Sequence, residues 1–155
     1  MKKNKNIEIK LKNDILIVNF KGKLNLMNLS LDSISDKYEG ILKKRIGHNF
    51  PSEYIPSNHF LSEYKSLCKY VIGIINQKDL AHELAHAKFY LEPDYKNKII
   101  NEWNNFDKQT QTYLYNFLKK LGYSDNVIID EYQAYRYTES DNFFGIKLNN
   151  KNWNI

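Results

Sequence analysis

The chain has 155 residues, of which 42% are hydrophobic and 14% aromatic, with a formal net charge of +5. This length suits one domain with a buried core, and the aromatic content excludes an intrinsically disordered chain. The positive charge is almost entirely lysine, because Arg45 and Arg136 are the two arginines. Since arginine is preferred for reading bases and phosphates, the charge indicates ordinary solvation, and we expect no nucleic-acid partner.

The amino-terminal segment lacks the pattern of a signal peptide. Charged side chains between Glu8 and Asp14 interrupt any apolar core, and no uncharged apolar run is long enough to span a bilayer. The single cysteine, Cys68, excludes an intrachain disulfide and a cysteine-rich zinc site. It lies beside an apolar run, where we expect it to be buried. These features predict an intracellular, cytoplasmic protein without a membrane partner.

The first half of the chain has the patterns of a small sheet. Alternating apolar residues over 7–20, interrupted by a polar turn, predict a β-hairpin. The segment 23–39 could form a helix, although its periodicity is weak. Glycine and prolines make 41–57 a predicted loop, and Ser57 is placed to cap a short helix that ends near Leu67. The apolar run 69–75 predicts a short buried strand.

The second half is predicted to be helical. The expected helices cover 78–91, 93–105, 107–121 and 125–138, with Pro and polar residues at their starts. The last residues, 139–155, are rich in Asn and Lys and predict a surface tail. We therefore expect a single α+β domain in which a small N-terminal antiparallel sheet packs on a helical half.

One motif carries chemistry, the sequence "HELAH" at residues 82–86. His82 and His86 are four residues apart, so on a helix they lie on one face, one turn apart. Two imidazoles at this spacing can bind one Zn²⁺. Glu83 projects beside them and can take a proton from metal-activated water.

A motif of this kind can also be a chance match, a hydrogen-bonded histidine pair in the core, or a pair of histidines on a solvated face. The flanking sequence argues against all three, because Leu80, Leu84, Ala87 and Leu91 form an apolar stripe while the face that carries His82 is also bordered by apolar residues. A helix that is apolar nearly all round is a buried one. Two buried histidines and a carboxylate need a partner, which favours a metal site.

The string "LAHELAHA" resembles the active-site helix of the zincin metallopeptidases, and "YVIGI" resembles the strand that precedes or lines their site. The resemblance covers residues 70–138 and does not extend to the first 69. Zincins differ in their third metal ligand. Position 92, where metzincin-like enzymes carry a histidine, is Glu92, and no histidine follows His86. The resemblance therefore implies a carboxylate ligand, either the Glu of gluzincins or the Asp of aspzincins.

Among the downstream carboxylates, Glu131 has the phase expected of a ligand. It shares a helix face with Ile128, Tyr132 and Tyr135, and a carboxylate in an apolar stripe is costly to bury unless a cation meets it. Asp130 lies one step round the helix and is expected to orient a ligand histidine. The remaining downstream acids are Glu92, Asp94, Glu102, Asp107, Asp125, Glu139 and Asp141.

The string "DEYQAY" resembles the Glu-x-x-Ala segment of several small gluzincin-like families. It departs from the thermolysin-like pattern, which has an Asp four residues after the Glu, because Tyr135 stands there. If Asp130 rather than Glu131 binds the metal, the site is of aspzincin type.

The resemblance implies a zinc-dependent peptidase that hydrolyses a peptide or protein substrate. His82, His86 and Glu131 would hold one Zn²⁺, Glu83 would be the general base, and Tyr135 or Tyr90 could assist at the oxyanion. The alternative is a non-catalytic, zinc-stabilised protein-binding module. Glu83 distinguishes the two, because a structural site ordinarily has four protein ligands and no use for that acid. A lysine- and tyrosine-rich nucleic-acid binder, recognisable by salt-sensitive binding, is the third hypothesis.

Overall fold

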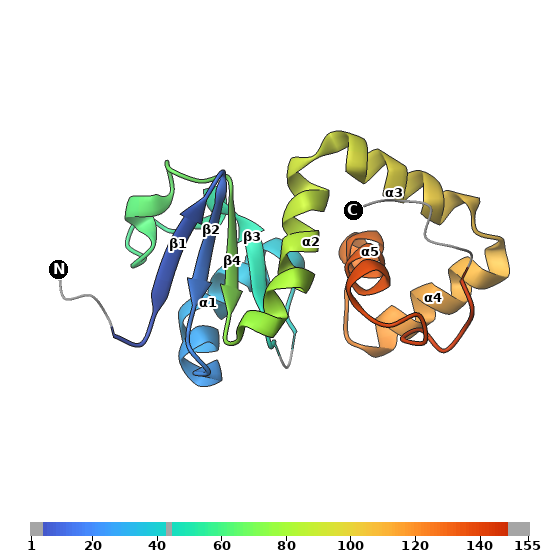
Figure 1. The fold of residues 1–155 in the computed structure, drawn as a ribbon, viewed down its shortest axis with the longest axis horizontal. Coiled ribbons are helices and arrows are strands. Elements are labelled where there is room, and N and C mark those ends of the chain that lie inside the picture. The colour runs from blue at the N-terminus through green and yellow to red at the C-terminus, as the bar shows by residue number, and fades with distance from the viewer. Residues whose placement is uncertain (1–4, 43–44, 149–155) are drawn as a thin grey trace.

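The computed structural model describes residues 5–42 and 45–148 and confirms the α+β class (Figure 1). A four-stranded sheet with one covering helix forms one side of the molecule, and three helices form the other. Helix α2 (Leu80–Leu91), which carries the "HELAH" motif, stands between them and contacts both strand β4 (Tyr70–Ile74) and helix α5 (Ile128–Thr138). The motif therefore lies where the two halves of the domain meet.

The sheet has the strand order β1-β2-β4-β3. Strands β1 (Glu8–Lys12) and β2 (Ile15–Asn19) form the predicted hairpin, and β3 (His48–Pro51) pairs antiparallel with β4 at the edge. The expectation of a wholly antiparallel sheet is wrong, because β2 and β4 are parallel. Fifty residues, which include helix α1 (Leu24–Glu39), separate these two strands and provide the crossover that parallel pairing requires.

Two short segments differ from the sequence prediction. Strand β3 lies inside the predicted loop 41–57, where His48, Asn49 and Pro51 hide the usual apolar alternation, and a proline is tolerated because the strand is at the edge. The helix predicted from Ser57 to Leu67 is absent, and this segment has turns and one 3₁₀ turn, η2 (Ser62–Tyr64). Another 3₁₀ turn, η1 (Ser52–Tyr54), follows β3 directly.

The remaining helices match the predictions closely. They are α3 (Pro93–Asn105), α4 (Lys108–Lys120) and α5, which follows the 3₁₀ turn η4 (Asp125–Val127); the 3₁₀ turn η3 (Gln77–Asp79) leads into α2. No helix in the two described ranges has the length and apolar character needed to cross a membrane. The cellular location stays a prediction.

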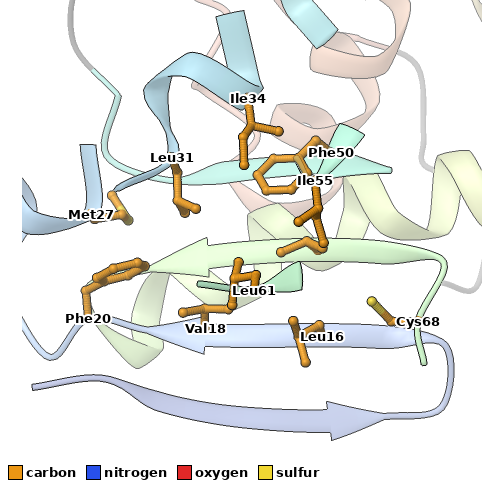
Figure 2. Packing of buried hydrophobic residues seen from close by; sticks show 11 residues of the cluster. Leu16, Val18, Phe20, Met27, Leu31, Ile34, Phe50, Ile55, Leu61 and Cys68 are labelled. Carbon is orange, nitrogen blue, oxygen red and sulfur yellow. The ribbon is translucent and has the colours of Figure 1, made fainter. Parts of the chain in front are cut away.

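Helix α1 packs on the sheet through Met27, Leu31 and Ile34, which repeat at helical spacing and are buried (Figure 2). The helix lies so close to the sheet that a side chain at Gly73 would place its Cβ 2.5 Å from Leu31 Cδ1. Cys68 is buried in the same cluster, as expected.

Strand β4 is buried along its whole length, because α2 covers the opposite face of the sheet with Ala87 against Tyr70, Ile72 and Ile74. This explains why its sequence is a continuous apolar run rather than an alternation.

The helical half has a separate aromatic core. Trp103 of α3, Leu118 of α4 and Tyr132 of α5 meet in it. Phe143 stacks on Tyr135, and Phe144 is buried in the same cluster. In the described part of the predicted surface tail, residues 139–142 are exposed as expected, whereas Phe143, Phe144, Ile146 and Leu148 pack against the helices. Residues 149–155 lie outside the described residues.

Candidate metal centre

Helices α2 and α5 bring together three side chains that could bind a metal ion. The Nε2 atoms of His82 and His86 are 3.2 Å apart. From α5, the carboxylate of Glu131 lies 3.7 Å from His82 Nε2 through Oε2 and 3.5 Å from His86 Nε2 through Oε1. The sequence therefore identified all three members of a group that could hold a metal ion.

The spacing of these atoms is close to that of the ligands around a tetrahedral ion. Zinc ligands at 2.0–2.2 Å from the metal are separated from one another by roughly 3.3–3.6 Å along the edges of a tetrahedron. The two imidazole nitrogens are 3.2 Å apart, and they lie 3.5 and 3.7 Å from the two different oxygens of Glu131. When each residue offers one ligand atom, the three atoms lie within 4.8 Å of one another. The side chains thus stand at distances that one metal ion could bridge without a large rearrangement.

The carboxylate of Glu131 lacks a full set of partners. The residue is 3% exposed, and its buried Oε2 atom has no hydrogen-bond partner among the residues that the structure describes. Burial raises the pKa of Glu131 to about 7, although the positive charge of His86 opposes this shift. A buried carboxylate oxygen without a partner is costly. A cation between the two helices would satisfy it.

Hydrogen bonds at the outer nitrogens fix the histidine rings. His86 Nδ1 lies 2.8 Å from Asp130 Oδ1, and His82 Nδ1 lies 3.4 Å from Thr138 Oγ1. Because His86 donates its Nδ1 proton to Asp130, the Nε2 of a neutral ring presents its lone pair to His82. Two facing lone pairs repel unless a proton or metal ion lies between them. The predicted role of Asp130, which was to orient a ligand histidine, agrees with this geometry.

The electrostatics of His86 also favour a cation. Burial by itself lowers the pKa of the ring, but Asp130 and Glu131 outweigh burial and raise it well above its ordinary value. The pKa of His82 is lowered by burial and by the neighbouring His86. The pair of imidazoles therefore stabilises one positive charge between them rather than two.

Gln133, which the sequence reasoning did not single out, locks α5 against α2. Its Nε2 donates to the carbonyl oxygen of Ala85 at 3.1 Å and to Asp130 Oδ1 at 3.0 Å, and its Oε1 accepts from the Tyr95 hydroxyl at 2.8 Å. The side chain is completely buried and fully hydrogen-bonded. It thereby fixes the position of α5, which supplies Glu131, along the length of α2, which supplies the two histidines.

Glu83 is buried beside His82, His86 and Glu131, and a side chain of the sheet hydrogen-bonds to its carboxylate. Asn49 Nδ2 donates to Glu83 Oε2 at 2.8 Å, and the Tyr70 hydroxyl donates to Asn49 Oδ1 at 2.6 Å. A side chain at Gly47 would place its Cβ 2.2 Å from Glu83 Oε1, so glycine leaves the space that this carboxylate occupies. Burial raises the pKa of Glu83, and His86 and His82 oppose the shift.

A cavity of about 280 Å³ opens over these groups. It is lined by all three ligand residues, by Glu83 and by Asn49. The expected base and the candidate metal ligands therefore share one space that a small ligand could enter.

The two tyrosines proposed from sequence have different positions. Tyr135 lines the cavity, with its ring centroid 4.6 Å from that of His82 and its hydroxyl 2.7 Å from the hydroxyl of Tyr123. Tyr90 is 42% exposed and packs against Tyr70, so the structure does not bring it to the site. Tyr123, which also lines the cavity, was missed because it lies in a connection without periodicity.

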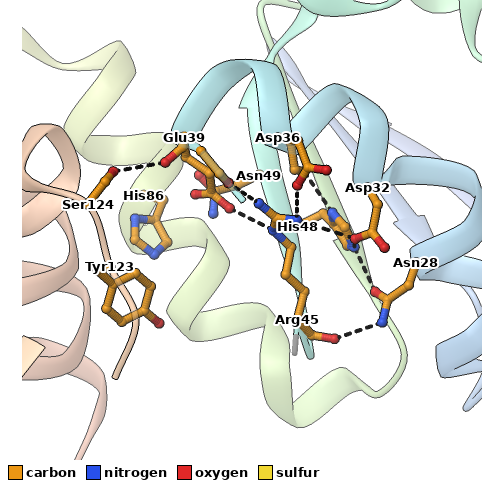
Figure 3. Close-up of polar contacts among 12 residues, drawn as sticks. Asn28, Asp32, Asp36, Glu39, Arg45, His48, Asn49, His86, Tyr123 and Ser124 are labelled. Carbon is orange, nitrogen blue, oxygen red and sulfur yellow. Dashed lines mark hydrogen bonds and ion pairs between the residues drawn. The ribbon is translucent and has the colours of Figure 1, made fainter. Parts of the chain in front are cut away.

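A buried ion-pair cluster anchors the segment that supplies Gly47 and Asn49 (Figure 3). The Arg45 guanidinium donates to Glu39 at 3.0 Å, to Asp36 at 2.6 Å and to the carbonyl oxygen of Gly40 at 2.6 Å. Burial raises the pKa of Glu39 to about 7, although Arg45 opposes this shift. The sequence offered no signal for this cluster beyond acids at helical spacing in α1.

Comparison of the chain with protein-family models, curated proteins and solved structures gives no match. The zincin resemblance stays a prediction that rests on the residues of the motif helix and of α5.

Proposed function

We propose that this protein is a zinc-dependent peptidase of gluzincin type. The observation that carries the proposal is the convergence of His82, His86 and Glu131 with the buried carboxylate of Glu83 in one cavity. Two imidazole nitrogens and one carboxylate are a donor set that suits zinc, and three protein ligands leave a coordination position open. A purely structural site ordinarily fills all four positions with protein ligands.

Zinc in this site would act as a Lewis acid on a carbonyl oxygen and lower the pKa of a water molecule. Glu83 then accepts the proton of the attacking water and delivers it to the departing amine. Asn49 holds one oxygen of this carboxylate at 2.8 Å. The carboxylate is thereby oriented before substrate arrives, which avoids an entropic cost during the reaction.

We assign Tyr123 and Tyr135 the role of stabilising the negatively charged oxygen that develops on the attacked carbonyl. Their hydroxyls are 2.7 Å apart and belong to residues that line the cavity. Burial raises the pKa of Tyr135 to about 12 and raises that of Tyr123 further. Both hydroxyls therefore keep their protons at neutral pH and can donate a hydrogen bond to developing negative charge.

The test compares wild type with Glu83→Gln in a peptidase assay, with zinc measured by elemental analysis in the same samples. We expect about one zinc per chain in both proteins and a loss of turnover of roughly 10²–10⁴-fold in the variant. Glu63→Gln, an exposed glutamate outside the cavity, is the matched control and should match wild type. Bound zinc without turnover in wild type would contradict the proposal and favour a zinc-stabilised binding module.

A further inference from the structure

Three aliphatic side chains line the cavity. Leu42 and Ile46 come from the segment that leads to β3, and Leu121 comes from the end of α4. The two segments meet, because a Cβ at Gly122 would lie 3.7 Å from Leu42 Cδ2. We call Leu42, Ile46 and Leu121 the aliphatic wall.

The wall is open to solvent although it is apolar. Ile46 is 66% exposed and Leu121 is 49% exposed. Other residues that line the cavity are charged, and they include Lys78, Asp79 and Glu139. The cavity therefore presents two chemically different surfaces to a ligand. Exposed apolar side chains gathered at a concave site mark a place where a ligand buries apolar surface.

We propose that the aliphatic wall binds an apolar side chain of the peptide substrate, next to the bond that is cleaved. This inference rests on the proposed peptidase function. The wall and the candidate metal ligands line the same cavity, so a peptide at the metal group can place a neighbouring residue against the wall. An acidic side chain there would lose hydration and gain no hydrogen-bond partner from Leu42, Ile46 or Leu121.

The dimensions of the cavity favour a peptide side chain over a second copy of the chain. A volume of about 280 Å³ is at the lower end of small-ligand sites. A stable dimer buries roughly 800 Å² on each partner, which three aliphatic side chains do not provide. The occupant is thus one or two residues of an extended peptide.

The experiment uses zinc-loaded protein and two peptide hydroxamates that differ only in one residue, leucine or aspartate, beside the metal-binding group. Isothermal titration calorimetry should give a dissociation constant at least about tenfold lower for the leucine compound, from burial of one aliphatic side chain. In the double variant I46S/L121S the preference should fall below about threefold. Leu67→Ser, which changes another exposed leucine outside the cavity, should keep the full preference.

The outcomes separate the two claims. Equal affinity of wild type for both hydroxamates overturns the inference about the wall and leaves the peptidase proposal standing. Failure of zinc-loaded wild type to bind either compound contradicts an open metal position, and therefore the proposed function and the inference together. If the double variant keeps the leucine preference but changes the oligomeric state in light scattering, the wall is an interface between copies and the inference is wrong.

Discussion

Asp130 Oδ1 lies 2.8 Å from the Nδ1 of His86, on the side of the ring opposite to the candidate metal position. The next residue, Glu131, approaches the Nε2 of the same ring at 3.5 Å. Two consecutive acids of α5 therefore act on one histidine from its two edges. The first orients the ring, and the second completes the group that could hold the metal.

Glu131→Ala is expected to weaken zinc binding more than Asp130→Ala. The first substitution removes a ligand, whereas the second removes a hydrogen bond to a ligand and should cost roughly ten- to a hundredfold in affinity. Competition with a chromophoric chelator measures both values. Asp125→Ala, an exposed acid ahead of α5, is the control and should leave affinity unchanged. Loss of zinc from Asp130→Ala with retention in Glu131→Ala would make the site aspzincin-like.

The expected helix phase explains why α5 was predicted well. With about 100° per residue, only one of two adjacent acids can face the core with Ile128 and Tyr135. Glu131 is 3% exposed and faces the histidines, while Asp130 lies at the edge of the contact with α2. The motif spacing thus identified His82, Glu83 and His86, and helix phase identified Glu131 as the third member of the group that could hold a metal and Asp130 as the acid beside His86.

Contacts between distant segments were not predictable in the same way. Asn49 reaches Glu83 from 34 residues away, and it lies on a strand of four residues whose pattern was hidden by polar side chains. The parallel pairing of β2 with β4 depends on the path of α1 between them. Tyr123 reaches the site from a turn, where no period indicates which side chain points inward.

Asn49→Ala should lower kcat by about tenfold, because Glu83 loses the hydrogen bond that orients it. Zinc content and KM should stay near the wild-type values, since Asn49 does not belong to the group that could hold the metal. Steady-state kinetics with parallel zinc analysis check this split. A change confined to KM, with kcat unaltered, would contradict a positioning role for Asn49.

Gly47→Ala tests whether Glu83 needs the space that the glycine leaves for its carboxylate. The new Cβ would be 2.2 Å from Glu83 Oε1, so the carboxylate must move. A displacement of about 1 Å in a reacting group can cost on the order of a hundredfold in rate. We expect this loss of kcat with zinc retained and with an unchanged far-ultraviolet circular dichroism spectrum. Wild-type turnover in the variant would show that Glu83 does not depend on this space.

His48 should make folding stability depend on pH. The ring is fully buried, with Nδ1 2.7 Å from Ser35 Oγ and Nε2 2.9 Å from Asn28 Oδ1. Burial lowers its pKa to about 3; nearby Arg45 adds to the shift, and Asp36 opposes it. Another acid, Asp32, lies 3.7 Å from Nε2.

Because a histidine in the unfolded chain has a pKa near 6.5, only the unfolded state takes up a proton on His48 between about pH 6.5 and 3. The contribution of His48 to the free energy of unfolding is complete above pH 6.5 and is lost as the pH falls. Between pH 7 and 5 the loss should be about 2 kcal/mol in the free energy of unfolding.

Urea unfolding of chelator-treated protein at pH 7 and pH 5 measures this effect. His48→Gln removes the titrating group and should remove the corresponding part of the pH dependence. His59→Gln changes another histidine and should keep the dependence of wild type. An identical slope in His48→Gln and wild type would contradict a neutral buried His48.

Arg45→Met should destabilise the fold by about 3 kcal/mol, because it leaves the buried Glu39 carboxylate without its cation. Part of this loss should return in the double variant R45M/E39Q, which also removes the unpaired charge. Lys37→Met, an exposed substitution on α1, is the control. Thermal or urea unfolding provides the comparison, and equal stabilities of the single and double variants would argue against the ion pair.

The most direct test of the metal centre is the zinc content of the purified chain and of two single variants, His82→Ala and His86→Ala. The geometry of the His82, His86 and Glu131 group predicts about one zinc per wild-type chain, measured by inductively coupled plasma mass spectrometry after dialysis. Both variants should lose most of this zinc, because each lacks one imidazole ligand. Equal zinc content in wild type and both variants would contradict the metal centre and the peptidase function built on it.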